Sequence, residues 1–425
     1  MKSLSTWTRS LIERRLNESY IRMICVLVLA AYLVILSISF GTNVRGRTIF
    51  GPFLGADFGA FYIAGRIFNT YPPDRIYDSV LHQQLYQQQF PDAPPDSHLP
   101  YANAPFFILP FTLLARLQYS WAYFVWLLFS LALYVAGLAL LWGTLKAIPE
   151  GLWLTTLLLA VSFMPFLVEC LAGGQTSACG VSCVALAITF ERRGHPILSG
   201  LALSLCSYKP TLLLLILPML LITGRYATLL AVVAGNGLLV LLSLAVVGWQ
   251  GCLGYLHTLF YFANASVSTV SGLRPWKYAD LNSFFRLLLG ERPVLRWMLL
   301  ASSSLIGLGL LARCWWRAER KSENDQSLVW ALTLAWTPVL NIYMGIYDSS
   351  LIVLSVLLTT DVLYRRVADR TRLSYGYKTI LLLLYVTPWI TQAVARLTGI
   401  QFYTLTLVLL GCFQIKQFRL QEVSP

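Results

Sequence analysis

The chain has 425 residues, of which 57% are hydrophobic and only 12% are charged. Soluble domains are roughly 45–50% apolar and about 25% charged, so the composition argues against a soluble enzyme, a disordered chain and a nucleic-acid-binding domain. The net charge of +13 comes largely from short basic clusters between apolar runs, a pattern typical of membrane proteins. We therefore expect an all-α, polytopic integral membrane protein without a nucleic-acid partner.

Twelve segments are candidate membrane spans, because a helix of about 20 apolar residues crosses the hydrocarbon core of a bilayer. In chain order they are residues 21–40, 119–143, 151–169, 175–190, 196–208, 211–224, 226–248, 294–313, 327–345, 347–364, 375–394 and 402–416. Basic residues concentrate on the cytoplasmic side. This rule places both termini inside and makes residues 1–425 one multi-pass domain in the cell membrane.

Two apolar segments do not fit a simple span. Residues 104–117 are too short, and counting them as a span would invert every later loop, so we expect a re-entrant segment or a partner to an irregular neighbour. Residues 196–224 carry Lys209-Pro210 in their middle and basic residues at both ends. That pattern favours two short spans over one long helix.

Two long loops, residues 41–103 and 249–293, fall on the same non-cytoplasmic face. The first contains an amphipathic stretch at 57–71 and a Gln-rich, helix-like run at 80–90. Long ordered loops on a rigid scaffold frequently carry function. We therefore look for the reactive residues in these two loops and at the outer ends of the spans.

Asp57 is the first candidate catalytic residue. It stands in GADFGAFY, residues 55–62, soon after the first span. A carboxylate among Gly, Ala and Phe is poorly solvated, which raises its pKa and its value as a base. The alternative is a helix N-cap, where Asp is also favoured.

Three further polar residues are expected on the same outer face as Asp57, namely Gln175, Lys209 and Asp348. Ionisable residues inside apolar spans are costly and usually functional. Glu169 and Asp361 are also ionisable residues in apolar spans, so the question of a functional role applies to them as well. We expect Asp57, Gln175, Lys209 and Asp348 to line one cavity that opens to the outside.

Cations of the two outer loops can bind a phosphate or pyrophosphate together with Lys209. Arg274 and Lys277 are the candidates in the second loop. Pairing with nearby aspartates or contact with anionic membrane lipid are the alternatives. His257 is a candidate proton relay, or an isolated histidine at the membrane interface.

No P-loop, Rossmann glycine pattern or His-x-x-x-His motif occurs in the sequence, so a nucleotide-driven pump or a metalloenzyme has no support. Most of the eight cysteines lie in apolar runs, and no His or carboxylate joins them at metal spacing. We expect no metal and no cofactor.

The order of short motifs along the chain resembles glycosyltransferase family 87, the polyprenol-phosphate-mannose-dependent mannosyltransferases of the GT-C superfold. The resemblance runs from about residue 50 to 350 and rests on Asp57-Phe58, IYD at 76–78, YANAPF at 101–106, GGQTS at 173–177, SGLA at 199–202, Lys209-Pro210 and NSF at 282–284. Each motif alone is weak, and their order carries the match.

The resemblance implies an inverting transfer of a sugar, with mannose as the default, from a polyprenyl-phosphate donor to a hydroxyl of a glycolipid or glycan. Asp57 would be the general base, while Lys209, Arg274 and Lys277 would stabilise the leaving phosphate without a metal. The remaining candidate substrate-binding residues are Tyr62, Arg66, Tyr101, Asn103, Gln175, Asn282 and Tyr347.

The sequence departs from the family at a late outer turn, where members commonly carry a histidine. Residues 337–343 and 347–348 contain none, so Asp348 or His257 would take its place as a catalytic residue. Two other functions stay open: a transporter or flippase for lipid-linked saccharides, disfavoured because we find no internal repeat, and a non-catalytic membrane subunit.

Overall fold

A computed structural model describes residues 17–44, 47–50, 54–92, 99–267, 274–290, 292–318, 322–342, 344–366 and 373–421. Within these ranges the regular elements are helices, and extended pairing is limited to two isolated bridges, Val44 with Arg47 and Tyr278 with Gly345. The prediction of an all-α chain is therefore confirmed for the residues described.

In the part of the chain that the structure describes, six helical stretches are long and apolar enough to cross a membrane, and several such helices indicate a multi-pass membrane protein. They are α2 (Glu18–Gly41), α6 (Tyr119–Trp142), Tyr226–Tyr261 of α11 (Tyr226–Val267), α13 (Pro293–Arg317), η9 (Ile346–Leu351) with α15 (Ile352–Arg366), and α16 (Tyr375–Thr398). A seventh is formed if η4 (Glu150–Leu152) and α7 (Trp153–Val161) are joined with η5 (Pro165–Ala172), across a bend of 54°.

The other predicted spans are also helical, but they are shorter. They are α8 (Ser177–Arg192), α9 (Pro196–Ser204) with η6 (Leu205–Tyr208), η7 (Pro210–Leu213) with α10 (Ile216–Ile222), α14 (Glu323–Val339) and α17 (Phe402–Gln421). Each of the twelve predicted segments thus corresponds to helix, although the count of twelve crossings is not confirmed.

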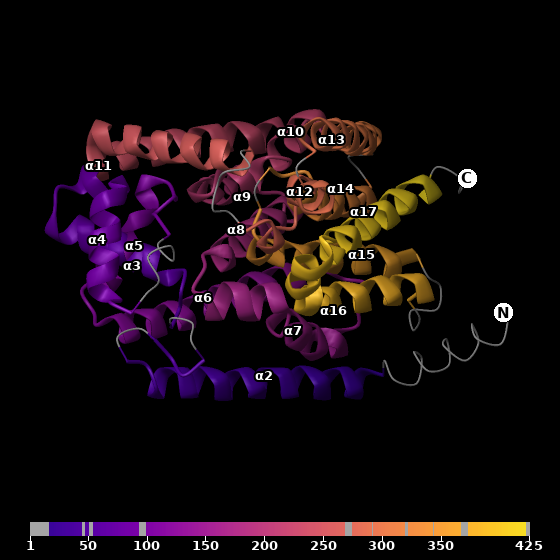
Figure 1. Ribbon diagram of the computed structural model, residues 1–425. Coiled ribbons are helices and arrows are strands. Elements are labelled where there is room, and N and C mark those ends of the chain that lie inside the picture. Colours follow the sequence, from indigo (N-terminus) through magenta and orange to yellow (C-terminus); the bar gives the residue numbers. More distant parts are fainter. Residues whose placement is uncertain are drawn as a thin grey trace.

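Short helices follow α2 and gather at one end of the molecule (Figure 1). They are α3 (Phe58–Thr70), η1 (Pro73–Tyr77), α4 (Ser79–Gln89), η3 (Pro105–Ile108) and α5 (Leu109–Leu114). The two helices expected in the first loop are therefore present. The start of α2 and the end of α17 lie at the opposite end of the view.

In the second predicted loop, residues 249–267 are helical and continue α11, and this helical continuation was not predicted from the sequence. Gly248 has φ 69° and ψ −178°, so the chain turns there and resumes its helix. The continuation packs on η1, where Gly251 and Gly254 approach Asp74 and Tyr77. The described residues from 274 onward contain η8 (Pro275–Lys277), followed by α12 (Leu281–Leu289).

Residues 196–224 fold as two short segments separated at Lys209, as expected. Lys209 has φ −139° and ψ 88°, which ends η6. Proline disfavours helical geometry in the residue before it and lacks an N–H of its own, so Pro210 accounts for the break. The membrane-embedded chain is thereby interrupted at its cationic residue.

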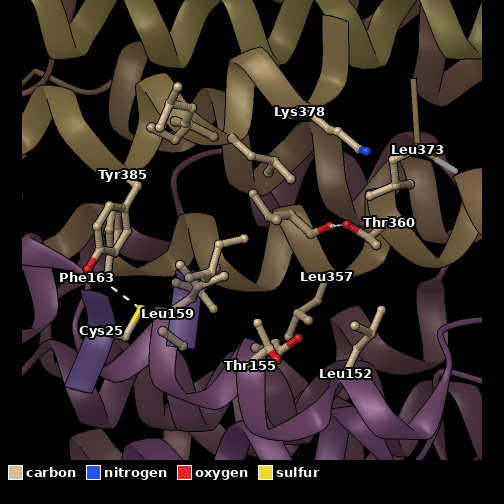
Figure 2. Close-up of a pocket in the computed structure, with 18 of the residues that line it drawn as sticks. Cys25, Leu152, Thr155, Leu159, Phe163, Leu357, Thr360, Leu373, Lys378 and Tyr385 are labelled. Atoms are coloured by element: carbon tan, nitrogen blue, oxygen red, sulfur yellow. Dashed lines mark hydrogen bonds between the residues drawn. The ribbon is translucent and has the colours of Figure 1, made fainter. Parts of the chain in front are cut away.

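An apolar cavity of about 480 Å³ lies between α2, α7, α15 and α16. Figure 2 shows Cys25, Leu159, Leu357 and Tyr385 directed toward it. The cavity is lined by the first two turns of α2, from Glu18 to Cys25. Because Asp57 follows the other end of α2, this cavity is separate from the polar residues described next.

Candidate functional site

One face of α6 fixes the backbone of the two loops that form the site. Tyr119, Tyr123 and Trp126 lie on successive turns of this face. The Tyr119 hydroxyl donates to a carbonyl of segment 54–55 at 2.6 Å, while Tyr123 and Trp126 donate to carbonyls of segment 172–174 at 2.8 and 3.2 Å. A single helix therefore sets the spacing of the two loops.

The glycine pair at 173–174 allows these loops to touch. Gly174 has φ +77°, and a Cβ there would lie 2.5 Å from the Cβ of Phe58. The Asp57 amide donates to the Gly173 carbonyl at 3.0 Å. Any side chain at Gly174 would push the start of α3 away. The two glycines therefore allow Asp57 to lie beside Gln175, the residue that follows them.

Asp57 occupies the N-cap position of α3, yet its side chain makes no capping hydrogen bond. Instead the Gln175 amide donates to the carboxylate oxygen Oδ2 at 2.8 Å. Burial raises the pKa of Asp57 above its usual value, while the Gln175 bond and the charges of Lys277 and Lys209 act to lower it. Asp57 is thus a half-buried carboxylate that interacts electrostatically with two cations.

Lys209 forms an ion pair with Asp348, and its ammonium lies 4.5 Å from the centroid of the Tyr347 ring. The Ser177 hydroxyl donates to the other Asp348 oxygen at 2.8 Å. Asp348 is completely buried, so both oxygens serve Lys209 and Ser177. The catalytic role expected for Asp348 stays a prediction.

Lys277 is positioned by contacts of its flanking backbone. The Tyr278 bridge to Gly345 joins its segment to the turn before Asp348. The side-chain amide of Gln401, from the start of α17, donates to the carbonyls of Trp276 and Tyr278 at 3.0 and 2.9 Å. These bonds tie η8 to the rest of the site.

Glu169 was raised only as a question by the sequence, and Gln392 was missed. Glu169 lies on the π-helix η5 and accepts a hydrogen bond of 2.5 Å from Gln392 of α16. Its carboxylate interacts electrostatically with Lys277 and with Asp57. A polar Gln inside the apolar run of α16 was the one available signal for this contact.

The comparisons with known proteins follow this geometry. The profile of glycosyltransferase family 87 matches residues 101–340, more than half of the chain. The chain belongs to glycosyltransferase family 87. No curated protein and no solved structure shows a significant match. Membership makes this chain a membrane glycosyltransferase, an enzyme that binds a sugar donor and an acceptor.

The cluster of this family 87 transferase joins six of the predicted site residues. They are Asp57, Gln175, Lys209, Lys277, Tyr347 and Asp348. These residues come from parts of the chain that are far apart in the sequence. Four of them, Asp57, Gln175, Lys209 and Asp348, were expected to lie together. Among the described residues no group of three or more His, Cys, Asp or Glu is arranged to hold a metal ion.

Three other predicted residues of the transferase use their side chains within the fold. The Tyr62 hydroxyl donates to the Leu117 carbonyl at 2.9 Å, and the buried Tyr101 hydroxyl donates to that of Ala104 at 3.3 Å. Arg66 donates to the side chain of Gln89 at 3.0 Å. These hydrogen bonds give the three side chains a role in holding the fold together, and they do not connect the side chains to Asp57.

The structure places the last four predicted residues as follows. His257 and Arg274 are exposed, and no contact among the described residues joins either of them to Asp57. Asn282 is buried and donates to the Ile342 carbonyl at 3.4 Å. The backbone carbonyl of Asn103 accepts a bond from Tyr77 at 2.6 Å.

Proposed function

We propose that the protein transfers a sugar, by default mannose, from a polyprenyl-phosphate donor to a hydroxyl of a glycolipid or glycan acceptor, with inversion at C1. The observation that carries the proposal is Asp57, a half-buried carboxylate that accepts a hydrogen bond from Gln175 and interacts electrostatically with Lys209 and Lys277. Transfer from a lipid phosphate needs a base for the acceptor and positive charge for the leaving group. Both are within this one cluster.

In the proposed mechanism the Asp57 carboxylate removes the acceptor proton as the acceptor oxygen attacks C1 of the sugar. The bond between C1 and the phosphate oxygen breaks, and polyprenyl phosphate leaves with the electron pair. Lys209 and Lys277 stabilise the negative charge that develops on the phosphate. Asp348 positions Lys209 through their ion pair, and the exposed Arg274 is left for the approach of the donor.

A lipid-linked donor agrees with the surroundings of α2. Only Cys25 and Ser39 are buried among the 24 residues of that helix, and the apolar cavity lies against its first turns (Figure 2). An apolar chain gains about 0.8 kcal/mol for each CH₂ that it buries. We propose that part of the polyprenyl tail enters here from the bilayer.

The proposed orientation has both termini in the cytoplasm and the site on the outer face. The start of α2 and the end of α17 lie at one end of the molecule, and α3, α4 and α5 lie at the other (Figure 1). Asp57 directly precedes α3. The donor would then react at the outer membrane boundary with an acceptor from outside.

The test is sugar transfer by the protein reconstituted in lipid vesicles, with radiolabelled polyprenyl-phosphate mannose and a crude envelope-lipid extract as acceptor. Asp57→Asn should lower the rate at least 100-fold, because general-base catalysis contributes roughly 10²–10⁴-fold. Asp74→Asn, an exposed carboxylate of the same loop, is the control and should retain full activity. Equal transfer by wild type and Asp57→Asn would refute the assignment of the base.

A further inference from the structure

The half-buried carboxylate of Glu169 has no part in the mechanism above. It lies on η5, at the point where the bent pair of α7 and η5 ends against the Gly173-Gly174 turn. Gln392 binds one of its oxygens, Oε1, at 2.5 Å. The other oxygen makes no hydrogen bond to any described residue, and the side chain is half-buried.

The position of Glu169 relative to the reacting groups is specific. Glu169 lies four residues before Gly173, whose carbonyl accepts the Asp57 amide. Its partner Gln392 lies one turn before Arg396, whose guanidinium carbon is 4.8 Å from the centroid of the Trp276 ring, next to Lys277. Electrostatic interactions of Glu169 with Lys277 and Asp57 agree with this placement. In the proposed reaction Asp57 contacts the attacking hydroxyl, and Lys277 contacts the leaving phosphate. The sugar ring must lie between these two groups, because C1 is bonded to the incoming oxygen as it separates from the outgoing one. Glu169 therefore borders the space that the sugar occupies.

Carboxylates suit the recognition of sugar hydroxyls, because an ionised carboxylate accepts several hydrogen bonds and those to charged groups are the stronger class. We infer that Glu169 binds a hydroxyl group of the transferred sugar through its second oxygen, and that Gln392 orients it from α16. This inference rests on the proposed function and gives the site a residue that selects among sugar donors.

Gln392, which would help Glu169 to select the sugar, lies outside the region matched by the family profile. Residues 101–340 include Glu169 but not α16. An amide that holds Oε1 leaves only one orientation for Oε2, which reduces the entropy lost when the sugar binds. Gln392→Leu should therefore weaken the same sugar contact as a change at Glu169, but by a smaller factor.

The experiment combines Glu169→Ala with monodeoxy donors. From a panel of polyprenyl-phosphate hexoses and pentoses, the donor used best by wild type is prepared with each ring hydroxyl removed in turn. Glu169→Ala should lower kcat/KM for the parent donor roughly 10- to 100-fold, the range for a hydrogen bond to a charged group. For one deoxy donor, the one lacking the bound hydroxyl, the same substitution should change kcat/KM less than twofold.

Two variants keep the result interpretable. Glu169→Gln preserves the size of the side chain and should show the same donor pattern with a smaller loss. Glu191→Ala removes a half-buried carboxylate from the far end of α8, where it pairs with Arg225, and should affect all donors equally. Thermal unfolding of each variant in detergent verifies that the fold is retained.

The outcomes separate the inference from the proposed function. An equal loss with every donor, or no loss with any, while wild type transfers sugar, would overturn the role of Glu169 alone. If wild type transferred no sugar from any donor of the panel, the proposed function would be refuted, and the inference with it.

Discussion

The side-chain amide of Gln175 donates a hydrogen bond of 2.8 Å to the carboxylate of Asp57, although 118 positions separate them in the chain. This bond satisfies one oxygen of a poorly solvated carboxylate and stabilises its charged form. It also leaves the second oxygen available to an acceptor hydroxyl. The hydrogen bond between Gln175 and Asp57 should therefore influence how the rate of transfer depends on pH.

The rate of transfer should fall as the pH decreases through the pKa of Asp57, because only the ionised carboxylate can act as the base. Burial raises that pKa, and the Gln175 bond lowers it. Gln175→Leu removes the lowering contribution, so the acidic limb of kcat/KM against pH should move to higher pH. Gln89→Leu, which breaks a contact to Arg66 elsewhere in the first loop, should leave the profile in place. A shift to lower pH in Gln175→Leu would contradict this assignment.

Substitutions in the ion pair of Lys209 with Asp348 should have distinguishable effects on protein stability and on donor binding. Lys209→Met leaves the completely buried Asp348 charge without its partner, which should cost about 3 kcal/mol of unfolding free energy. Adding Asp348→Asn removes that charge and should recover most of the stability. The donor KM should stay high in the double variant, because the cation for the phosphate is still missing.

Thermal unfolding and donor kinetics on the same preparations test this cycle. Recovery of stability and of donor KM together would show that Lys209 acts only through its structural pair.

Gly174 and Gly194 offer a matched test of the contact between the two loops. Both have positive φ, +77° and +78°, so alanine should cost each roughly 1–2 kcal/mol of backbone strain. A Cβ at Gly174 would also meet Phe58 at 2.5 Å, whereas one at Gly194 meets nothing within 4 Å. Gly174→Ala should therefore lose stability beyond Gly194→Ala and should also lose transfer. Equal effects on unfolding and on rate would argue against a role for this close approach.

Gln401 directly precedes α17 and Gln414 lies within it, and each is buried with two donated hydrogen bonds. Their replacement by leucine should destabilise the protein by similar amounts, about 1–3 kcal/mol. Gln401 binds the carbonyls that flank Lys277, and Gln414 binds side chains of α15. Only Gln401→Leu should raise the donor KM. The measurement is steady-state transfer at varied donor concentration, and an equal rise in both variants would contradict the prediction.

Periodicity and charge predicted most of the helical segments, because apolar runs and their breaks are local properties of the chain. The break at Lys209-Pro210 was predicted for the same reason, since proline acts on its immediate neighbour. The helix after Gly248 was not, because nothing local distinguishes a kink from the start of a loop when η1 supplies the packing surface.

The site was predictable in part. Asp57, Gln175 and Lys209 are polar residues in apolar surroundings, so their cost in the membrane marked them. The partner of each depends on three-dimensional packing, so the sequence did not predict that Asp348 is the counter-ion of Lys209. Tyr62 and Tyr101 were predicted to bind substrate, and in the structure their hydroxyls donate to nearby carbonyls.

The shared face of α6 has a consequence for the exchange of parts between related enzymes. Segments 54–55 and 172–174 are both held by Tyr119, Tyr123 and Trp126. The conformation of each loop therefore depends on α6. A chimera that grafts the first loop from a relative onto this scaffold must bring the matching α6 residues with it. Divergence of these loops is therefore coupled to a helix that bears none of the reactive groups.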